Sequence, residues 1–517
     1  MDQMTPRRTA EAMAMPATWG AMDSFGQDRA VERAIEKLKR AGLQPLAPSD
    51  VIAFSDIKRF EERWAADRKF RAAYPADPRR LGEAYGLRAD PEIVRPVWDS
   101  ANVERGEENP PPIFARYLAF NASLRTWRNQ KIAGVIPRDM RFVRWRERQI
   151  HRLNLEVGVN VAANPHIPAS FELSRGCSVG CWFCSSAPPK LGEVFRYTSA
   201  NARLWRGMLE VIRNVAGSAA QASICYSGTD PFDNPDYEFF AADFAGIMGE
   251  HPNTSTAMPT RDIERTRRMI AVSPPRWLRF SVLSLGMLSK IHAAFSPEEL
   301  LLVTVSPRNE GASGAQGMIF AGRAQQNVAT YRKYRSDTLM NTPSCETGFM
   351  FNLVERTIKL ASPCAPHEQW PLGFRVYDER RFETPEDVKW IVNEMMDCHM
   401  ARKVSELPLL RFQSCLRFEP TPGGFALIGP HLRQRFEATR EMPLMTKLGV
   451  MVQSGQYGAE KLISLIEQHG AARESVVDAL DELFRLGVLD EGPWDGANAG
   501  AMISPTNDET TNVGETR

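Results

Sequence analysis

Residues 171–184 read FELSRGCSVGCWFC, and this stretch decides what fold and chemistry the rest of the chain must support. Its three thiols belong to Cys177, Cys181 and Cys184, which are separated by three and then by two residues. The apolar run before them predicts a strand, so the thiols lie on a tight loop at the end of that strand. Iron-sulfur clusters are normally bound by four thiolates, so a loop with three leaves one iron open to a ligand that is not protein.

Two other interpretations of this loop do not involve an iron-sulfur cluster. A structural zinc knuckle requires a fourth Cys or His at similarly local spacing, and no His follows the loop closely. Three thiols can also pack in a core without any ligand. The alternation of short apolar runs with amphipathic segments around the loop favours the cluster, because it is the pattern of a parallel sheet or barrel. Strands are predicted at 224–226, 254–258, 278–283 and 301–305, and helices at 199–215, 237–248, 262–270 and 287–294.

The 517 residues divide into five predicted segments. Composition predicts flexible ends at 1–30 and 493–517, because both lack apolar periodicity. A helical N-terminal module is expected over 31–140 and the catalytic domain over 141–420. The segment 421–492 predicts a small winged-helix-like or leader-recognition domain, with two amphipathic helices before residues 487–489.

The charge balance and the hydropathy bound the classes of partner. Lys and Arg number 64 against 63 Asp and Glu, so no net field favours nucleic acid or a membrane surface. No stretch approaches the ~20 apolar residues that span a bilayer, and the first twenty residues lack a signal-peptide core. We therefore expect a cytoplasmic protein, in which eight cysteines stay reduced or bind metal.

The Cys-x-x-x-Cys-x-aromatic-Cys pattern, with Phe183 before the last cysteine, resembles the signature of the radical S-adenosylmethionine (SAM) superfamily. The resemblance implies a partial TIM-like (β/α)6 barrel with one 4Fe-4S cluster and SAM on its open iron. Residues 227–231 resemble in part the Gly-Gly-Glu-Pro stretch that receives the SAM amino group, although a plain turn capped by the aspartate has the same pattern. Ser281 is the expected ribose contact and Ser284 the alternative. The implied SAM-binding residues are Phe183, Gly228, Thr229, Asp230, Pro231 and Ser281.

A narrower resemblance covers most of residues 55–380. It is to the radical SAM peptidyl epimerases that mature proteusin-type ribosomal peptides, and it rests on residues 145–150, 168, 171–174, 176–184, 187–188, 230–237, 279–285, 362–364 and 370–378. The family implies conversion of L- to D-residues in a precursor peptide. A 5'-deoxyadenosyl radical removes a Cα hydrogen, and a cysteine thiol returns one from the opposite face. An outside flavodoxin or ferredoxin supplies the electron.

Four cysteines are candidates for the hydrogen donor once the cluster ligands and Cys225, in a predicted core strand, are set aside. We favour Cys364, which follows a predicted element at 349–360 within a Pro-flanked loop. Cys345 is the runner-up, and Cys398 and Cys415 lie in regions of weaker resemblance. An inert buried cysteine remains the alternative for each.

The remaining cysteines form no Cys-x-x-Cys pair, so we expect a single cluster. The precursor leader has two candidate docking segments. Residues 423–489 loosely resemble a peptide-recognition element, and residues 50–98 are the other candidate. Either segment can instead be a plain structural cap. The competing functions are a radical SAM peptide cyclase, a splicease or a methylthiolating RNA enzyme. A non-catalytic Fe-S or zinc scaffold comes from a different class, and nucleic-acid binding rests only on Arg runs such as 265–268.

Overall fold

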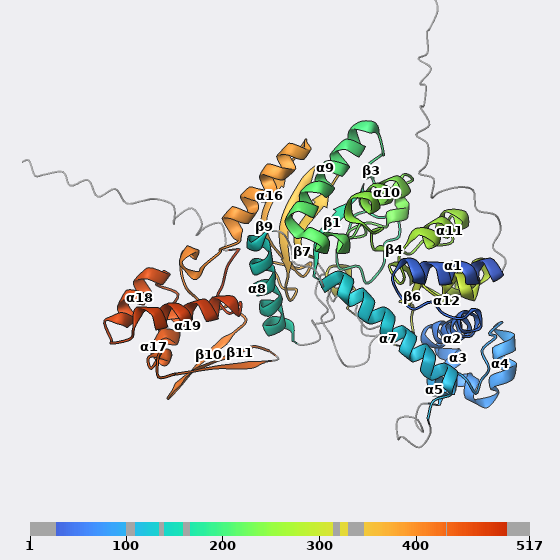
Figure 1. Cartoon of the computed structure of the whole chain (residues 1–517), viewed down its shortest axis with the longest axis horizontal. Helices are drawn as coiled ribbons and strands as arrows, with labels where there is room; N and C mark the ends of the chain where they lie inside the picture. The colour runs from blue at the N-terminus through green and yellow to red at the C-terminus, as the bar shows by residue number, and fades with distance from the viewer. Residues whose placement is uncertain are drawn as a thin grey trace, which may run out of the picture.

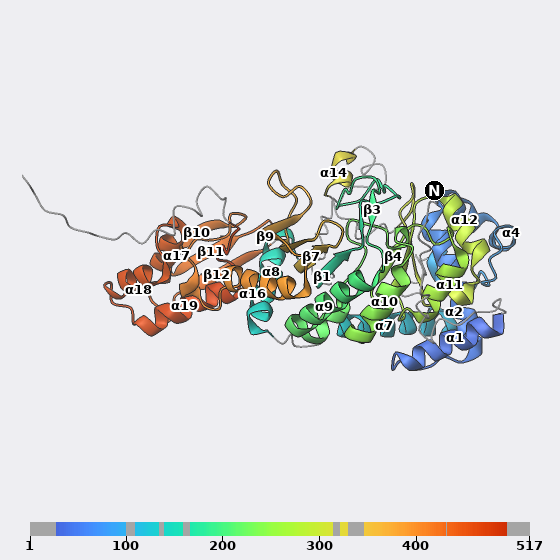
Figure 2. The same cartoon turned by 90° about the horizontal axis from the view of Figure 1, so that it is seen from above.

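We describe a computed structural model of the chain for residues 27–99, 109–133, 139–158, 166–313, 321–328, 346–430 and 432–493. The predicted flexible ends lie almost wholly outside these residues. The first helix, α1 (Gln27–Arg40), nevertheless begins inside the segment 1–30. It does so because Ala30, Val31, Ala34 and Leu38 recur at helical spacing and are all buried. The molecule is elongated, with the N-terminal helices at one end and the last helices at the other (Figures 1 and 2).

The N-terminal helices pack around an apolar cluster of their own. It includes Phe54, Phe60, Phe70, Tyr74 and Tyr117, whose rings contact one another mostly edge to face. Several of these helices are short because aspartate caps and prolines restart the chain, as Asp67 and Asp77 do at the third and fourth of them. They are α1, α2 (Pro48–Ala66), α3 (Arg68–Ala73), α4 (Pro78–Ala84), α5 (Arg95–Trp98) and α7 (Pro112–Ala133).

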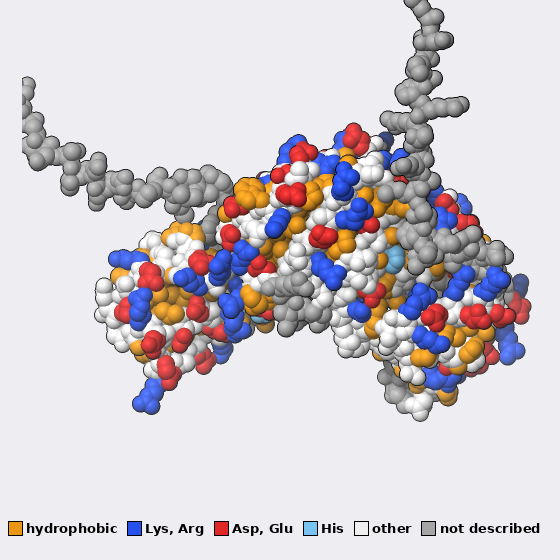
Figure 3. Space-filling view, turned by 45° about the horizontal axis from the view of Figure 1, so that its top comes forward, with side chains coloured by type: hydrophobic (Ala, Val, Ile, Leu, Met, Phe, Trp, Pro, Cys, Tyr) orange, Lys and Arg blue, Asp and Glu red, His pale blue; other side chains and the backbone are white. Residues whose placement is uncertain are grey.

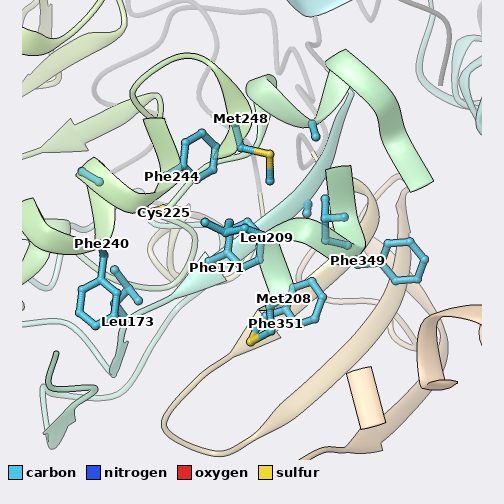
Figure 4. Packing of buried hydrophobic residues seen from close by; sticks show 14 of the residues in the cluster. Phe171, Leu173, Met208, Leu209, Cys225, Phe240, Phe244, Met248, Phe349 and Phe351 are labelled. Carbon is cyan, nitrogen blue, oxygen red and sulfur yellow. The ribbon is translucent and has the colours of Figure 1, made fainter. Parts of the chain in front are cut away.

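A four-stranded sheet forms the centre, in the order β1-β7-β8-β9. Its strands are β1 (Ile167–Glu172), β7 (Glu346–Asn352), β8 (Thr357–Pro363) and β9 (Phe374–Arg381). One face is apolar and packs on α8 (Met140–Val157), α9 (Ser199–Ala216) and α16 (Pro385–His399). Phe171 and Phe351 lie beside Leu209 and Met208 of α9 (Figure 4), while Phe349 stacks on Phe142 of α8. The opposite face carries polar residues, so alternation along the strands separates the core from the site.

Parallel segments extend the centre beyond β1. Ser170 of β1 bridges to Ile224, and Ile224 bridges to Asn253, next to β4 (Thr254–Thr256). Strands β5 (Leu278–Val282) and β6 (Thr304–Pro307) then follow in parallel. The helices between them are α10 (Tyr237–Met248), α11 (Ile263–Val272), α12 (Leu285–Ala294) and α13 (Pro297–Leu300). The fold is therefore mixed α/β, as predicted, and in the described residues the strands do not close into a barrel.

Three predicted elements differ from the structure. The segment 224–226 forms only an isolated bridge at Ile224. The strand predicted at 301–305 begins instead at Thr304, because Leu301 and Leu302 pack against the N-terminal helices after α13. The element predicted at 349–360 is a hairpin of two strands, since Asn352 turns the chain by accepting from the N–H groups of Val354 and Glu355.

The C-terminal part has a separate apolar cluster built from 404–489 and from Leu155 of α8. Helix α17 (Met445–Ser454) packs on an antiparallel sheet of β10 (Arg417–Thr421), β11 (Gly424–Ile428) and β12 (Arg433–Glu437). Helices α18 (Ala459–Glu467) and α19 (Arg473–Arg485) pack on each other in the same cluster. The two predicted helices before residue 487 are confirmed as α18 and α19. The cluster draws on residues well before 421, where the boundary was predicted.

The surface mixes charges of both signs on the face shown in Figure 3, as the near-neutral composition requires. Among the described helices, none combines the length and apolar character that crossing a membrane demands.

Candidate functional site

The cysteine loop leaves the sheet after β1 through a hairpin of β2 (Ser174–Arg175) with β3 (Glu193–Val194). Gly176 turns the chain at φ +85°, and a Cβ there would lie 2.4 Å from the Lys190 carbonyl oxygen. The position therefore requires glycine. The Cys177 N–H then donates to the Pro189 carbonyl at 3.0 Å, which fixes the start of the loop against its return segment.

All three loop cysteines line one cavity of about 240 Å³. Burial raises the pKa of each thiol, and it raises that of Cys181 to about 12, with Cys184 and Cys177 as the next causes. The three sulfur atoms are thus close enough for a negative charge on one to disfavour charge on another. A bound cation centre removes this repulsion and deprotonates thiols that coordinate it. The loop therefore fits a group that binds through several thiolates.

No set of three or more His, Cys, Asp or Glu side chains in the described ranges is already arranged around a single ion. A cubane iron-sulfur cluster requires a different arrangement, because each thiolate binds a separate iron. The fit of the loop to a cluster consequently rests on its shared cavity and on the electrostatic coupling of its thiols.

The stretch 227–231 lines the same cavity up to Asp230. Gly228 has φ +69°, and a Cβ there would lie 2.2 Å from Oε1 of Glu172. Asp230 is buried, and burial raises its pKa to about 6. Its oxygens accept from the N–H groups of Phe232 at 3.0 Å and Ala257 at 2.8 Å. The Asp230 carboxylate thus caps a turn and ties the stretch to the end of β4, while Pro231 begins that turn outside the cavity lining.

Thr229 and Phe183 also line the cavity. The Thr229 hydroxyl makes a short hydrogen bond with the Ser174 hydroxyl, which joins the stretch to the cysteine hairpin. Phe183 lies under the guanidinium of Arg308, whose Cζ is 5.7 Å from the ring centroid. The structure therefore brings together the cysteine loop and all the predicted SAM-binding residues except Pro231.

Ser281 lines the cavity from β5, whereas Ser284 caps α12 by accepting from the Met287 N–H at 3.1 Å. Sequence reasoning missed Arg279, which points the same way as Ser281 because the two are two residues apart on one strand. Its Nε donates to the Ser255 hydroxyl at 2.9 Å, and its guanidinium lies over Tyr226. Strand alternation was the signal that could have found it.

Three further charged residues of the cavity carried no sequence signal. Arg308 follows β6, Arg323 follows a turn at Gly322, and Glu346 begins β7. The Arg323 N–H donates to the Cys184 carbonyl at 2.9 Å, so this arginine is fixed directly to the cysteine loop. The cavity consequently contains both cations and carboxylates, which suits a ligand with charges of both signs.

Glu172, the last residue of β1, lies behind the Gly228 turn. Burial raises its pKa to about 8, and its Oε2 accepts from the Asn352 amide at 2.8 Å. The carboxyl lines a smaller neighbouring cavity of about 220 Å³ with Lys359 of β8. It therefore supports the turn at the base of the main cavity.

Cys364 lies on the other side of the sheet. It is fully buried and is absent from the lining of the cysteine cavity. Burial raises its pKa to about 12, with Glu156 and Arg152 of α8 as the next influences. The neighbouring Ala365 N–H donates to Glu156 Oε1 at 2.8 Å, so this segment is held against α8.

The other cysteines differ in their surroundings. Cys345 lies outside the described residues, directly before Glu346 of the cavity. Cys225 is buried in the core, as predicted. Cys415 is partly buried near the same α8 charges as Cys364, and Cys398 is exposed.

No family model matches the chain, and no solved structure matches it. A relative among curated proteins is the uncharacterized protein y4wI of Sinorhizobium fredii, which is 33% identical over 462 residues. The alignment covers 86% of this chain and 88% of the relative. By this similarity along nearly the whole length, the chain belongs to the family of the Sinorhizobium y4wI protein.

Proposed function

We propose that this protein is a radical SAM peptidyl epimerase, which converts L- to D-residues in a ribosomally synthesised precursor peptide. Cys177, Cys181 and Cys184 would hold one 4Fe-4S cluster. The observation that carries the proposal is the single cavity that these thiols share with residues 228–230 and Ser281. These segments are far apart in the sequence, and each is one that the radical SAM resemblance independently implies.

The arrangement of parallel segments supports the finer fold assignment, a partial (β/α)6 barrel. Six of them, at β7, β1, Ile224, β4, β5 and β6, neighbour one another in that order. The cavity residues Ser281 and Arg308 lie at the carboxyl ends of β5 and β6, and the cysteine loop follows β1. Ligands of parallel α/β folds bind at this end of the strands.

When bound, the cluster and SAM would supply a carbon-centred radical able to remove a Cα hydrogen. The chain's own residues would orient and shield that chemistry. The Arg279 guanidinium, held by Ser255, is placed to bind a carboxylate. Gly228 lets the turn lie directly against the Glu172 carboxyl, because a side chain there would occupy the space that the carboxyl fills.

Inversion requires a hydrogen donor on the face opposite the abstraction, and we propose a cysteine thiol for it. Burial keeps Cys364 protonated, the form that has an S–H bond to donate. Its segment is held against α8, however, on the side of the sheet away from the cysteine cavity. Cys345, in contrast, directly precedes Glu346 of that cavity in the sequence. The experiment must therefore test both.

The remaining partners follow from the same proposal. A flavodoxin or ferredoxin would deliver the electron in the cytoplasm. The precursor leader would add to an edge of the β10-β11-β12 sheet, which α17 backs, as peptide-recognition sheets do.

The test is co-expression with a candidate precursor in deuterated water, followed by mass spectrometry and chiral analysis of the hydrolysed peptide. We expect one hydrogen to be replaced by one deuterium for each residue that becomes D. Cys181→Ala should abolish both labelling and the iron content of the purified protein. Cys345→Ala and Cys364→Ala distinguish the donor, since the true donor variant cleaves SAM without labelling the peptide.

Cys398→Ala is the matched control, because Cys398 is exposed on α16 and its loss should leave labelling intact. A peptide with altered connectivity, or an unlabelled peptide despite SAM cleavage, would retain radical chemistry and exclude epimerisation. A protein that holds iron but never cleaves SAM would instead be a scaffold.

A further inference from the structure

A second and larger cavity, of about 820 Å³, lies between α2, α7 and β6. It is lined by one edge of the strand, through Thr304, Val305 and Pro307, and by charged side chains of the two helices. None of the predicted site residues belongs to it. Its size exceeds that of the cysteine cavity, so the protein offers room for a ligand beyond a cofactor.

The two cavities are separated by the width of a single strand. Arg279 of the cysteine cavity pairs in register with Thr304 of the second cavity. Pro307 lines the second cavity and the next residue, Arg308, lines the first. A chain bound along the second cavity could therefore cross the carboxyl end of β6 and present a residue to the first.

Strand β6 contributes the edge of the β4-β5-β6 sheet to the wall of this second cavity. Among the described strands, β6 pairs with β5 alone. The Arg276 N–H donates to the Leu302 carbonyl and the Arg308 N–H to the Val282 carbonyl, both at 2.7 Å. Because backbone groups alternate along a strand, the N–H and carbonyl of Val305 point away from β5. Pro307 follows the usual rule that proline in a sheet lies on an edge strand. Such an edge can accept an extended peptide.

The second cavity has buried polar walls. The Lys58 and Glu62 side chains are 6% and 5% exposed and form an ion pair, and Glu62 Oε2 lies 2.9 Å from His292 Nε2. The Tyr117 hydroxyl donates to Glu61. Both carboxylates of the wall are thus engaged by neighbouring side chains.

Positive charge exceeds negative charge on the wall of this cavity. Its acidic residues are Glu61 and Glu62, whereas its basic residues are Lys58, Arg125, Arg128 and Arg276. Arg276 has φ +63°, and its guanidinium donates to the Asn121 side chain at 3.0 Å, which orients it toward α7. The wall consequently complements an acidic ligand.

We propose that this cavity binds an acidic, extended segment of the precursor peptide, paired with the edge of β6 at Val305. The inference rests on the proposed function, because it assigns a docking groove to the peptide that the cysteine site would modify. A peptide backbone can pair with a strand edge, whereas a nucleic acid cannot, so the edge favours a peptide over another polyanion.

The test is fluorescence anisotropy with the full-length protein and a labelled peptide of about eight residues that alternates Glu with Val. We expect saturable binding that weakens with added salt. Arg125→Glu should weaken it about tenfold, because a charged contact becomes repulsive. Arg125 is exposed, so the substitution should not disturb folding. Arg125→Gln should have a smaller effect of the same sign.

The matched control is Arg203→Glu, an equal charge change at an exposed position of α9 outside this cavity. Equal weakening by Arg203→Glu, or equal binding of a Lys-Val peptide, would overturn the groove. Absence of saturable binding would overturn it as well, including the case in which another segment of the chain covers the edge. Cys181→Ala should bind the peptide normally, so loss of the cluster and loss of the groove give separate results.

Discussion

The two faces of the β1-β7-β8-β9 sheet both carry polar and ionisable side chains, but in different surroundings. On the cavity face, Glu172, Asn352 and Lys359 are half-buried and border open volume. On the α8 face, Arg152, Glu156 and Arg375 are buried and meet one another, with Arg152 Nη1 2.6 Å from Glu156 Oε2. The comparison teaches that charge alone does not mark a functional site. A binding site has polar and ionisable groups that border open volume, whereas a structural site has charged groups that contact each other.

The largest expected effect lies at the α8 side, where Arg148 forms a bidentate pair with Glu491 at 2.7 and 2.6 Å. Both side chains are almost fully buried. Arg148→Met should lower the free energy of unfolding by about 3–5 kcal/mol, because it leaves a carboxylate buried without its partner. Urea denaturation measures the loss.

The double variant Arg148→Met/Glu491→Leu should recover most of that stability, since no unpaired charge remains. The exposed pair of Arg485 and Glu482 is the control, and Arg485→Met should change stability by less than about 0.5 kcal/mol. Equal losses at the two pairs would remove the distinction between buried and exposed charges here.

A medium effect is expected on the cavity side at Gly228. Gly228→Ala should destabilise the protein by about 2–3 kcal/mol and weaken the proposed SAM binding, because strain at positive φ adds to a clash with Glu172. Gly42 has nearly the same φ, +70°, and a Cβ there would meet nothing within 4 Å. Gly42→Ala should therefore cost only about 1 kcal/mol and spare SAM binding, as calorimetry would show. Equal costs would mean that the Glu172 carboxyl moves aside freely.

A further prediction concerns pH. Burial raises the pKa of Glu172 from 4.5 to about 8, so the folded state holds a proton that the unfolded state has released across this range. The stability that Glu172 contributes is therefore full below 4.5 and is lost as the pH rises toward about 8. Glu172→Gln should remove this slope. Wild-type and variant stabilities that stay parallel across the range would show that the carboxyl titrates normally.

Local spacing explains which parts of the site the sequence predicted. Cys177, Cys181 and Cys184 lie within eight residues of one another, so no fold knowledge was needed to group them. Ser281 was found from a strand, and Arg279 could have been found by the same alternation. Arg308, Arg323 and Glu346 come from separate loops and strand ends, and only the folded chain brings them together.

The same alternation bears on Cys364. Ile358 and Leu360 of β8 pack in the core, and the Ser362 hydroxyl accepts from Arg152 of α8 at 3.0 Å. Cys364 continues this series by two residues and likewise meets α8, whereas Lys359 faces the cavity side. The sequence did not reveal it because residues 349–360 looked like one element, so the face of each strand could not be assigned.

The Arg148–Glu491 pair joins residues 343 positions apart, and this separation matters for how the chain is made. A helix that precedes the cysteine loop depends for its charge balance on a carboxylate that is synthesised 343 residues later. During synthesis on the ribosome, Arg148 of α8 stays exposed to water until the C-terminal helices emerge and dock. Completion of the central unit thus waits for residue 491, and the nascent cysteine loop would spend the intervening synthesis within an unfinished fold.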